Sequence, residues 1–317
     1  MNYDASNCTL CPRRCGADRR ECAGACRAPD SAVVHSAFLH RFEEPVISGS
    51  DSARGSGAVF FSGCTMRCVY CQNAEISRRA DGESFTPERL AGLFLSLRDR
   101  GAYNINLVSP TPYVPYITEA LDICGDELGI PIVYNTGGWE NAQTVRALEG
   151  YVGVWLTDFK YADDDLARRY SGAENYRETA LEALREEVGQ SASAEYYFDG
   201  KSKLMRRGVI VRHLCLPGHR RDTEAVLRLL AAEFILATLE FDPGEITLSL
   251  MRQYTPGFAP PQYRELSRRV TSFEYEFALD LAGELGFSGF SQEKDSASCS
   301  YTPDFAGKGG EVGKNFG

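Results

Sequence analysis

The sequence predicts an α/β protein: a partial (β/α)6 TIM-like barrel of parallel strands, preceded by a small cysteine-rich metal-binding segment. The first observation behind this prediction is that short apolar runs alternate with longer amphipathic patterns, as in βαβ units. The second is that six such strand-like runs occur, enough for a partial barrel. The third is the absence of a Gly-x-Gly-x-x-Gly motif after the first run, which disfavours a Rossmann or flavodoxin-like sheet.

The chain divides into three parts. Residues 1–57 hold a cysteine-rich stretch at 8–26 and then a turn-rich stretch at 31–57, which we interpret as a linker with short extended pieces. Residues 58–290 form the predicted barrel. Residues 291–317 are a glycine-rich tail that we expect to be loose at its end.

Within the barrel the elements follow in regular order. The strand-like runs are 58–61, 105–109, 132–135, 152–157, 209–214 and 246–251. Between them lie helical patterns at 86–101, 115–128, 140–149, 163–187, 222–236 and 261–285. The first helix has a Thr86 cap and Pro87 at its first position. Residues 188–207 contain an Asp-Gly turn that favours an excursion or hairpin before the fifth strand.

Composition narrows the classes of partner. The formal net charge of −10, with arginine pairs scattered along the chain, disfavours nucleic-acid binding. The longest apolar stretch, 226–239, contains Arg228 and Glu233 and so predicts a buried helix and not a membrane span. The first residues lack the apolar region of a signal peptide. We therefore expect a cytoplasmic protein, in which eleven cysteines indicate metal chemistry more than disulfides.

The N-terminal cysteines predict a metal site. Their CxxC-like spacings could supply four thiolates to zinc or to an iron–sulfur cluster, with one cysteine spare, and the sequence does not choose between these metals. So short a segment needs a metal to fold. The residues are Cys8, Cys11, Cys15, Cys22 and Cys26.

A second group, Cys64, Cys68 and Cys71, lies beyond the linker on a glycine-led loop that follows the first strand. A four-iron, four-sulfur cluster bound by three cysteines keeps one iron without a protein ligand, and this open position can chelate a small molecule. Zinc or a disulfide is the alternative. Because structural zinc sites usually use two cysteine pairs, an isolated triplet fits zinc poorly.

The stretch FFSGCTMRCVYCQN, residues 60–73, resembles the CxxxCxxC signature of radical S-adenosylmethionine (SAM) enzymes. Residues 58–255 look like the uncharacterised activating-enzyme-like group of the pyruvate formate-lyase activating enzyme branch. The resemblance rests on NINLVSPTPYVP, YNTGGWE, DFKYADDDLARRYSGAENY, RGVIVRHLCLPGH and SLMRQYTP. It implies the barrel fold, a 4Fe-4S cluster, SAM cleaved to a 5′-deoxyadenosyl radical, and an electron donor such as flavodoxin or ferredoxin. By analogy, it also implies a protein glycine as substrate.

The resemblance further implies a set of SAM-binding residues after the predicted strands, where parallel α/β folds bind ligands. Ser109 and Thr111 replace the Gly-Gly-Glu turn that binds the SAM amino group in activating enzymes. The full set is Tyr70, Ser109, Thr111, Asn135, Thr136, Asp158, Lys160 and Arg212.

Simpler interpretations stand beside these assignments. Asp158 and Lys160 could form a salt bridge at the barrel rim. Arg212 lies in a buried strand and requires a carboxylate partner, either that of SAM or that of Asp158. His213 is typical of a core histidine with satisfied hydrogen bonds, and Cys124 and Cys215 of packing residues.

Two other functions remain open at this point. One is a radical SAM enzyme that acts on another peptide or on a small molecule. The other is a non-catalytic iron–sulfur or zinc protein that senses redox state or carries electrons. The open iron position and the polar residues at the strand ends favour an enzyme.

Overall fold

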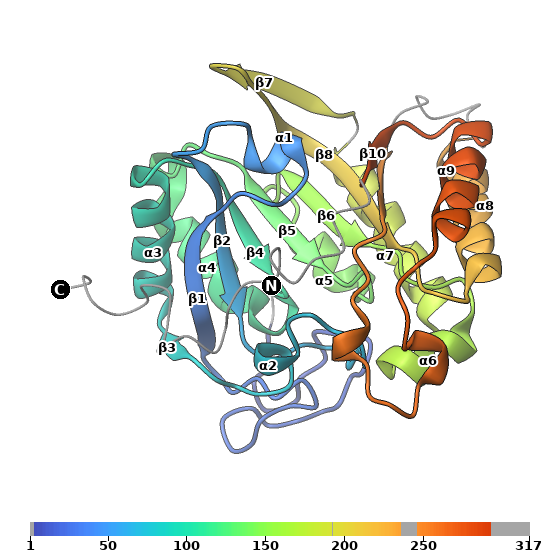
Figure 1. Cartoon of the computed structure of the whole chain (residues 1–317). Helices are drawn as coiled ribbons and strands as arrows, with labels where there is room; N and C mark the ends of the chain where they lie inside the picture. Colours follow the sequence, from blue (N-terminus) through green and yellow to red (C-terminus); the bar gives the residue numbers. More distant parts are fainter. Residues whose placement is uncertain (1–2, 192, 236–245, 293–317) are drawn as a thin grey trace.

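The computed structural model describes residues 3–191, 193–235 and 246–292. Its sheet has the order β10-β9-β8-β6-β5-β4-β2-β1-β3. The neighbours from β2 to β9 are all parallel, which confirms the six predicted strands and the partial barrel (Figure 1). These strands are β2 (Gly55–Phe61), β4 (Ala102–Val108), β5 (Ile132–Thr136), β6 (Val154–Asp158), β8 (Ser202–Leu214) and β9 (Ile246–Met251).

Helices follow the strands as expected. Thr86 caps the first long helix, its hydroxyl accepting from the N–H of Arg89 at 3.4 Å. The helices are α3 (Pro87–Asp99), α4 (Val114–Cys124), α5 (Ala142–Arg146), α6 (Asp164–Ser171), α7 (Tyr176–Ser191), α8 (Arg220–Phe234) and α9 (Ser272–Glu284). Two single turns, α1 (Pro45–Ser48) and α2 (Ala74–Ser77), lie in loops.

Two of the predicted helices are divided or begin later in the structure. The 163–187 pattern splits because Gly172 adopts φ +59°, a left-handed conformation that ends α6 before α7 begins. The 261–285 pattern becomes helical only after the capping box of Thr271 and Glu274. Before it, Arg264–Leu266 forms a 3-10 turn.

The interpretation of residues 31–57 as a linker is wrong. Residues Ala32–His40 form β1, which pairs antiparallel with β2 on one side and with β3 (Glu83–Phe85) on the other. At the other end of the sheet, β10 (Gly289–Ser291) pairs with β9. The predicted hairpin is confirmed, since β7 (Glu195–Asp199) pairs antiparallel with β8. Most of the predicted tail, from residue 293, lies outside the described residues.

The barrel interior is closed at one end by α1. Its Val46 and Ile47 pack against Val133, Leu156 and Ile210 of β5, β6 and β8. Figure 1 shows α1 at the top of the molecule, opposite the N-terminal loops. Because alternate strand residues share a face, residues two positions further along these strands also point inward, nearer the carboxyl ends. The sequence there is polar, and this is where a site can form.

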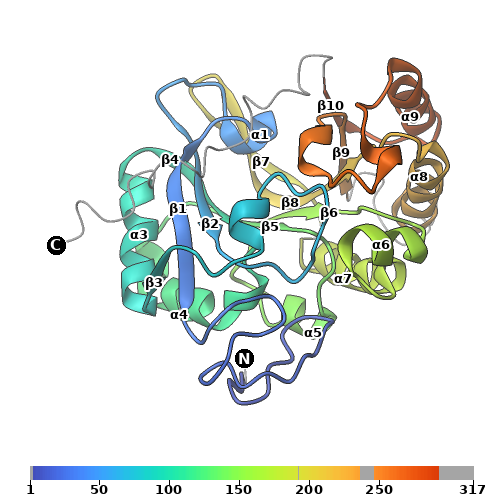
Figure 2. The ribbon, with the colours of Figure 1, turned by 60° about the horizontal axis from the view of Figure 1, so that its bottom comes forward.

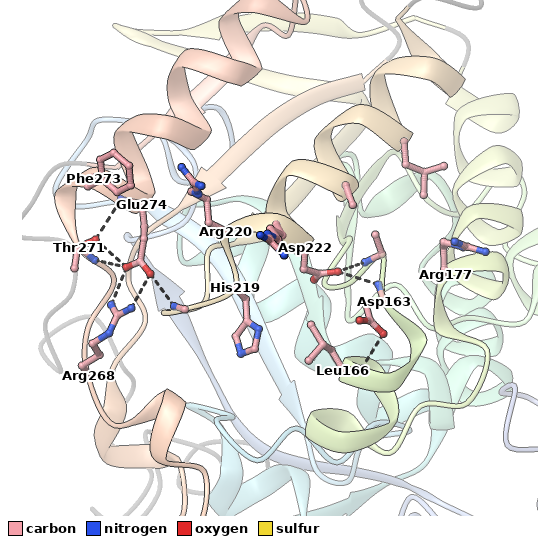
Figure 3. A pocket seen from close by; sticks show the side chains of 15 residues that line it. Asp163, Leu166, Arg177, His219, Arg220, Asp222, Arg268, Thr271, Phe273 and Glu274 are labelled. Atoms are coloured by element: carbon pink, nitrogen blue, oxygen red, sulfur yellow. Dashed lines mark hydrogen bonds and ion pairs between the residues drawn. The ribbon is translucent and has the colours of Figure 1, made fainter.

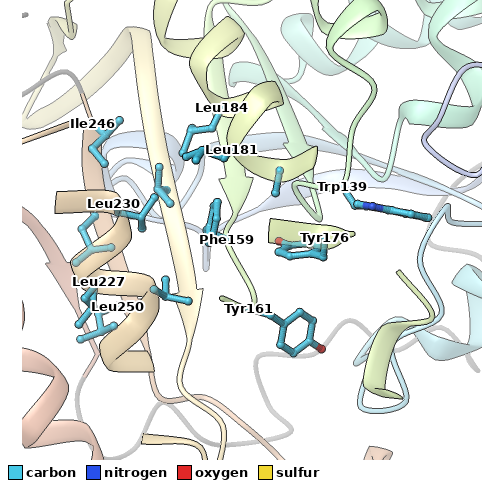
Figure 4. Packing of buried hydrophobic residues seen from close by; sticks show 14 of the residues in the cluster. Trp139, Phe159, Tyr161, Tyr176, Leu181, Leu184, Leu227, Leu230, Ile246 and Leu250 are labelled. Carbon is cyan, nitrogen blue, oxygen red and sulfur yellow. The ribbon is translucent and has the colours of Figure 1, made fainter. Parts of the chain in front are cut away.

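The opposite face of the sheet packs against the helices. Figure 4 shows Leu181 and Leu184 of α7, Leu227 and Leu230 of α8, and Leu250 of β9 in one buried cluster. In the part of the chain that the structure describes, no helix has the length and apolarity needed to cross a membrane.

Candidate active site

The three-cysteine loop leaves the carboxyl end of β2 and is fixed to the end of α6. The N–H of Arg67 donates to the carbonyl of Ser171 at 2.8 Å, and the N–H of Val69 donates to that of Tyr170 at 2.7 Å. Cys64, Cys68 and Cys71 on this loop are all partly exposed. The loop therefore presents its thiols at the end of the barrel where ligands of parallel α/β folds bind.

The surroundings of these thiols fit a bound iron–sulfur cluster. Ser171 Oγ donates to Cys68 Sγ at 3.0 Å, and Ser77 Oγ donates to Cys71 Sγ at 3.6 Å. Burial raises the pKa of the Cys64 thiol to about 12, and burial also raises the pKa of Cys68 although the Lys160 charge opposes it. Thiolates at such positions need donors or metal ions, and the two hydroxyls supply donors.

No group of three His, Cys, Asp or Glu side chains among the described residues is arranged to hold a single metal ion. A cluster does not require that arrangement, because each thiolate binds a different iron.

A chain of hydroxyl groups runs to the Cys68 sulfur. Tyr70 and Tyr161 share a hydrogen bond of 2.5 Å between their hydroxyls, and Tyr161 contacts Ser171 Oγ at 2.8 Å. Ser171 in turn donates to Cys68. Neither Tyr161 nor Ser171 is among the predicted site residues, although both lie within the stretch DFKYADDDLARRYS. Hydrogen bonds to cluster sulfurs tune reduction potential, so this hydroxyl chain can act on the cluster without ligating it.

A cavity of about 210 Å³ lies beside Cys68 and Cys71 at the carboxyl ends of the strands. The structure also brings five of the predicted SAM-binding residues to its wall: Tyr70, Asn135, Asp158, Lys160 and Arg212. They come from the cysteine loop, β5, β6 with its following loop, and β8. These residues are far apart in sequence, but they come together because the carboxyl ends of the parallel strands meet there.

Arg212 is the centre of an ion-pair network in this cavity. Its Nε lies 2.8 Å from Asp158 Oδ1, and its Nη2 donates to Asn135 Oδ1 at 2.5 Å. Lys160 pairs with the other Asp158 oxygen. Burial alone would raise the pKa of Asp158, but Arg212 and Lys160 hold it below its usual range. The rim salt bridge and the internal partner of Arg212, both considered from sequence, are present in the structure.

Two carboxylates next to this network, Glu43 and Glu44, are not among the residues predicted from sequence. Glu43 Oε2 lies 3.3 Å from Arg212 Nη1, and its Oε1 accepts from the Asn106 amide at 3.1 Å. Glu44 is 9% exposed, and burial raises its pKa although Arg212 opposes the shift. In the sequence they are only a pair of acids directly before Pro45, and nothing there points to the cavity.

Three predicted residues, Ser109, Thr111 and Thr136, are placed elsewhere. Ser109 turns the chain after β4 at φ +57°, and its N–H donates to the Asn135 carbonyl at 3.0 Å. The hydroxyls of Thr111 and Thr136 both donate to Glu140 Oε1, at 2.7 Å from Thr111. None of the three lines the cavity as the described residues form it.

The expected core residues are confirmed as such. His213 is 1% exposed, with Nδ1 2.8 Å from the Phe159 carbonyl and Nε2 3.0 Å from Thr223 Oγ1. Burial lowers its pKa to about 4, so the ring is neutral near pH 7. Cys124 and Cys215 are buried.

The N-terminal segment lies directly against the cysteine loop, although residues 27–63 separate the two cysteine groups in sequence. The N–H of Cys64 donates to the Cys26 carbonyl at 3.2 Å. Arg13 donates through Nε to the Thr65 carbonyl at 2.6 Å and through Nη2 to that of Gly172 at 2.8 Å. Figure 2, in which this end comes forward, shows the N-terminal loops beside α5. The two groups meet because β1 runs antiparallel to β2.

A larger depression of about 910 Å³ lies between α6, α8 and α9 (Figure 3). Its carboxylates already have partners. Asp222 Oδ1 accepts from the backbone N–H groups of Ala162 and Asp163, and Glu274 accepts from Gly218 N–H and Arg268. Because no thiol lines it and its carboxylates already have hydrogen-bond partners among the described residues, we place the chemistry in the smaller cavity.

A family model and several known proteins resemble this chain. The sequence model of the radical SAM superfamily matches residues 58–230. An uncharacterised protein of Methanocaldococcus jannaschii is 30% identical over 290 residues, which span 87% of this chain and 74% of that protein. Pyruvate formate-lyase-activating enzyme of Clostridium pasteurianum is 28% identical over 116 residues, spanning 34% of this chain and 46% of the enzyme.

Among solved structures, a radical SAM methyltransferase of Sphaerobacter thermophilus has a TM-score of 0.52 at 16% identity. The match spans 77% of this chain and 69% of that chain. At this identity the likeness concerns the fold.

Proposed function

Because the chain belongs to the radical SAM superfamily, we propose that it generates a radical in order to abstract hydrogen from a glycine residue of another protein. Members of the superfamily use a 4Fe-4S cluster and SAM. In this proposal Cys64, Cys68 and Cys71 hold the cluster. When bound and reduced, it supplies the electron that cleaves SAM into methionine and a 5′-deoxyadenosyl radical. The protein binds, orients and shields the reactants.

The residues of the cavity are suited to bind SAM. Arg212 offers a planar, permanently charged group that matches a carboxylate, and Lys160 adds a second cation. Asp158 holds both cations in place at the carboxyl end of β6. The contact of Arg212 with Glu43, at 3.3 Å, is longer than those with Asp158 and Asn135. An incoming SAM carboxylate can therefore replace Glu43 on the Nη1 side of Arg212.

The small size of the cavity favours a substrate that is part of another protein. Its volume of about 210 Å³ is below the range of about 300–1,000 Å³ typical for ligand sites. A ligand of the size of SAM would take up all of this space, which leaves no enclosed volume for a second small molecule. The substrate then approaches from the mouth, where the Phe42 ring is 61% exposed. A glycine within a protruding loop is the narrowest group that another protein can present there.

The partial similarity to pyruvate formate-lyase-activating enzyme supports the same substrate class. We test it with reconstituted anaerobic enzyme, SAM, reductant and a library of pentapeptides with a central α,α-dideuterated glycine. The proposal expects deuterium in the 5′-deoxyadenosine. If SAM is cleaved and deuterium transfers only from side-chain-labelled peptides or from small molecules, the enzyme has a different substrate. Intact SAM beside a redox-active cluster would instead indicate an electron carrier.

We also propose where the electron donor docks. A depression of about 230 Å³ beside Cys64 is lined by Arg27, Arg67 and Arg78, in a chain whose net charge is −10. An acidic one-electron carrier such as flavodoxin or ferredoxin complements this basic patch.

The variant Arg27→Glu should slow cluster reduction by reduced flavodoxin several-fold at low ionic strength and leave reduction by dithionite unchanged. Arg228→Glu, on the exposed face of α8, is the matched control. Equal rates in the two variants would place the docking site elsewhere.

A further inference from the structure

Among the described residues, two carboxylates line the cavity in which SAM is proposed to bind: Asp158 and Glu43. Both oxygens of Asp158 already have cationic partners, because Oδ1 lies 2.8 Å from Arg212 Nε and Oδ2 pairs with Lys160. Glu43 differs from it. Its Oε1 accepts from the Asn106 amide at 3.1 Å, whereas the one contact of its Oε2 within the described residues is with Arg212 Nη1, at 3.3 Å.

Glu43 reaches the cavity from the segment between β1 and α1, outside the parallel strands. Its N–H donates to Ser48 Oγ at 3.0 Å, which ties its backbone to the end of α1. The amides of Asn106 on β4 and Asn135 on β5 donate to its Oε1, at 3.1 and 3.4 Å. These contacts do not involve Arg212, so they hold the carboxylate in the cavity even when Arg212 takes another partner.

The proposed exchange at Arg212 would leave the Glu43 carboxylate without a cation. When the SAM carboxylate takes the Nη1 side of Arg212, Glu43 remains as a charge with a side chain only 13% exposed, and a buried charge that loses its partner is strongly destabilising. The carbon of SAM that carries the carboxylate also carries an ammonium group, so the amino acid head of SAM is neutral overall. Its insertion between Arg212 and Glu43 gives each of the two side chains a partner of opposite charge.

We propose that Glu43 binds the α-ammonium group of SAM. In the complex Arg212 Nη1 donates to the SAM carboxylate and the SAM ammonium group donates to Glu43 Oε2, so that the ligand separates an ion pair already present in the free protein. This assignment rests on the proposed binding of SAM in this cavity and adds the residue that recognises the amino group. A ligand with the carboxylate but no ammonium group would leave Glu43 unpaired, so Glu43 also selects against such ligands.

The neighbouring Glu44 is not suited to this role. It is 9% exposed and does not line the cavity, and its Oε2 has no hydrogen-bond partner among the described residues. Burial raises its pKa although Arg212 opposes the shift, which favours the neutral carboxylic acid. A neutral acid offers an ammonium group no opposite charge. Glu44→Gln is therefore a matched control, one residue away from Glu43.

The assignment is tested by the binding of SAM and of desamino-SAM, in which hydrogen replaces the α-amino group. Isothermal titration calorimetry is performed anaerobically on the reconstituted full chain without reductant, so that neither compound is cleaved. The unaltered protein should bind SAM roughly tenfold to a hundredfold more tightly than desamino-SAM, because one charge-assisted contact is lost with the analogue. Glu43→Gln should lose most of this preference, and Glu44→Gln should retain it.

The comparison of the two compounds on the unaltered protein needs no variant, and melting temperatures without ligand check that both variants are folded. Equal affinities of the unaltered protein for SAM and desamino-SAM would overturn the role of Glu43 and leave the proposed SAM site intact. A preference that persists in Glu43→Gln, or that is lost only in Glu44→Gln, would also overturn it. If the unaltered protein bound neither compound, the SAM site itself would be refuted, and the assignment with it.

Discussion

Replacing Arg212 with methionine should destabilise the folded protein and should also weaken SAM binding. The substitution keeps length and apolar bulk but removes the cation that contacts Asp158 and Glu43. Both carboxylates have side chains only 13–14% exposed, so water cannot replace the lost partner. Removing one member of a buried ion pair costs about 3–5 kcal/mol.

The structure places the cost near the lower end of that range. Asp158 keeps Lys160 as a partner, and Glu43 keeps the amides of Asn106 and Asn135. A loss of about 3 kcal/mol corresponds to a melting temperature lower by roughly 5–10 °C for a chain of this size. SAM affinity should also fall roughly tenfold to a hundredfold, because a charge-assisted contact is worth about 1.5–3 kcal/mol.

The assay measures melting without SAM and SAM affinity on the same reconstituted variants. The control is the double variant Glu43→Gln/Arg212→Met, in which no carboxylate is stranded at position 43 and part of the stability should return. An Arg212→Met protein that melts like the unaltered protein would refute the stranded-charge argument. Unchanged SAM affinity together with a large melting loss would refute the ligand role of Arg212.

Three further predictions concern the cluster and the core. Cys68→Ala should remove the SAM-cleaving cluster and leave the metal site predicted for the N-terminal cysteines loaded; metal and sulfide counts check this, and loss of all metal from a folded protein would contradict it. Ser171→Ala should lower the reduction potential of the cluster, because the hydroxyl that donates to Cys68 Sγ is lost. A redox titration should show a shift of tens of millivolts, since about 59 mV corresponds to 1.4 kcal/mol for one electron. An unchanged potential would show that the hydroxyl chain does not tune it. Burial raises the pKa of Glu187 from 4.5 to about 8, so the folded state binds this proton more tightly and stability falls as pH rises through that window. The stability of Glu187→Gln relative to the unaltered protein should therefore rise by on the order of 1 kcal/mol per pH unit between pH 5 and 8, as measured by urea titration. If the unfolding free energies of the two proteins changed in parallel with pH, Glu187 would not be a buried neutral carboxyl.

The predicted positions of Asn135, Asp158 and Arg212 follow from local patterns. Each lies at or near the carboxyl end of an apolar run, and parallel strands bring such ends together. Glu43 could not be found this way. It reaches the cavity because β1 turns back along β2, and that antiparallel pairing has no signal within residues 31–57 themselves.

Thr111 and Thr136 show a different limit. Thr111 follows β4 and Thr136 ends β5, but their hydroxyls bond to Glu140, which is 2% exposed. Glu140 lies just after the Gly137-Gly138 pair, and nothing in the sequence around it indicates that it is buried. The direction in which a short polar side chain points depends on tertiary packing that the pattern does not contain.

The closure of the barrel by α1 has a kinetic consequence. Val46 and Ile47 fill the interior at the amino ends of the strands, so ligands reach the cavity from the carboxyl ends. A protein substrate seated over that mouth would block both the entry of SAM and the departure of methionine and 5′-deoxyadenosine. Binding should then be compulsorily ordered, with SAM first, and excess protein substrate should inhibit turnover by capturing the enzyme in a dead-end complex before SAM arrives.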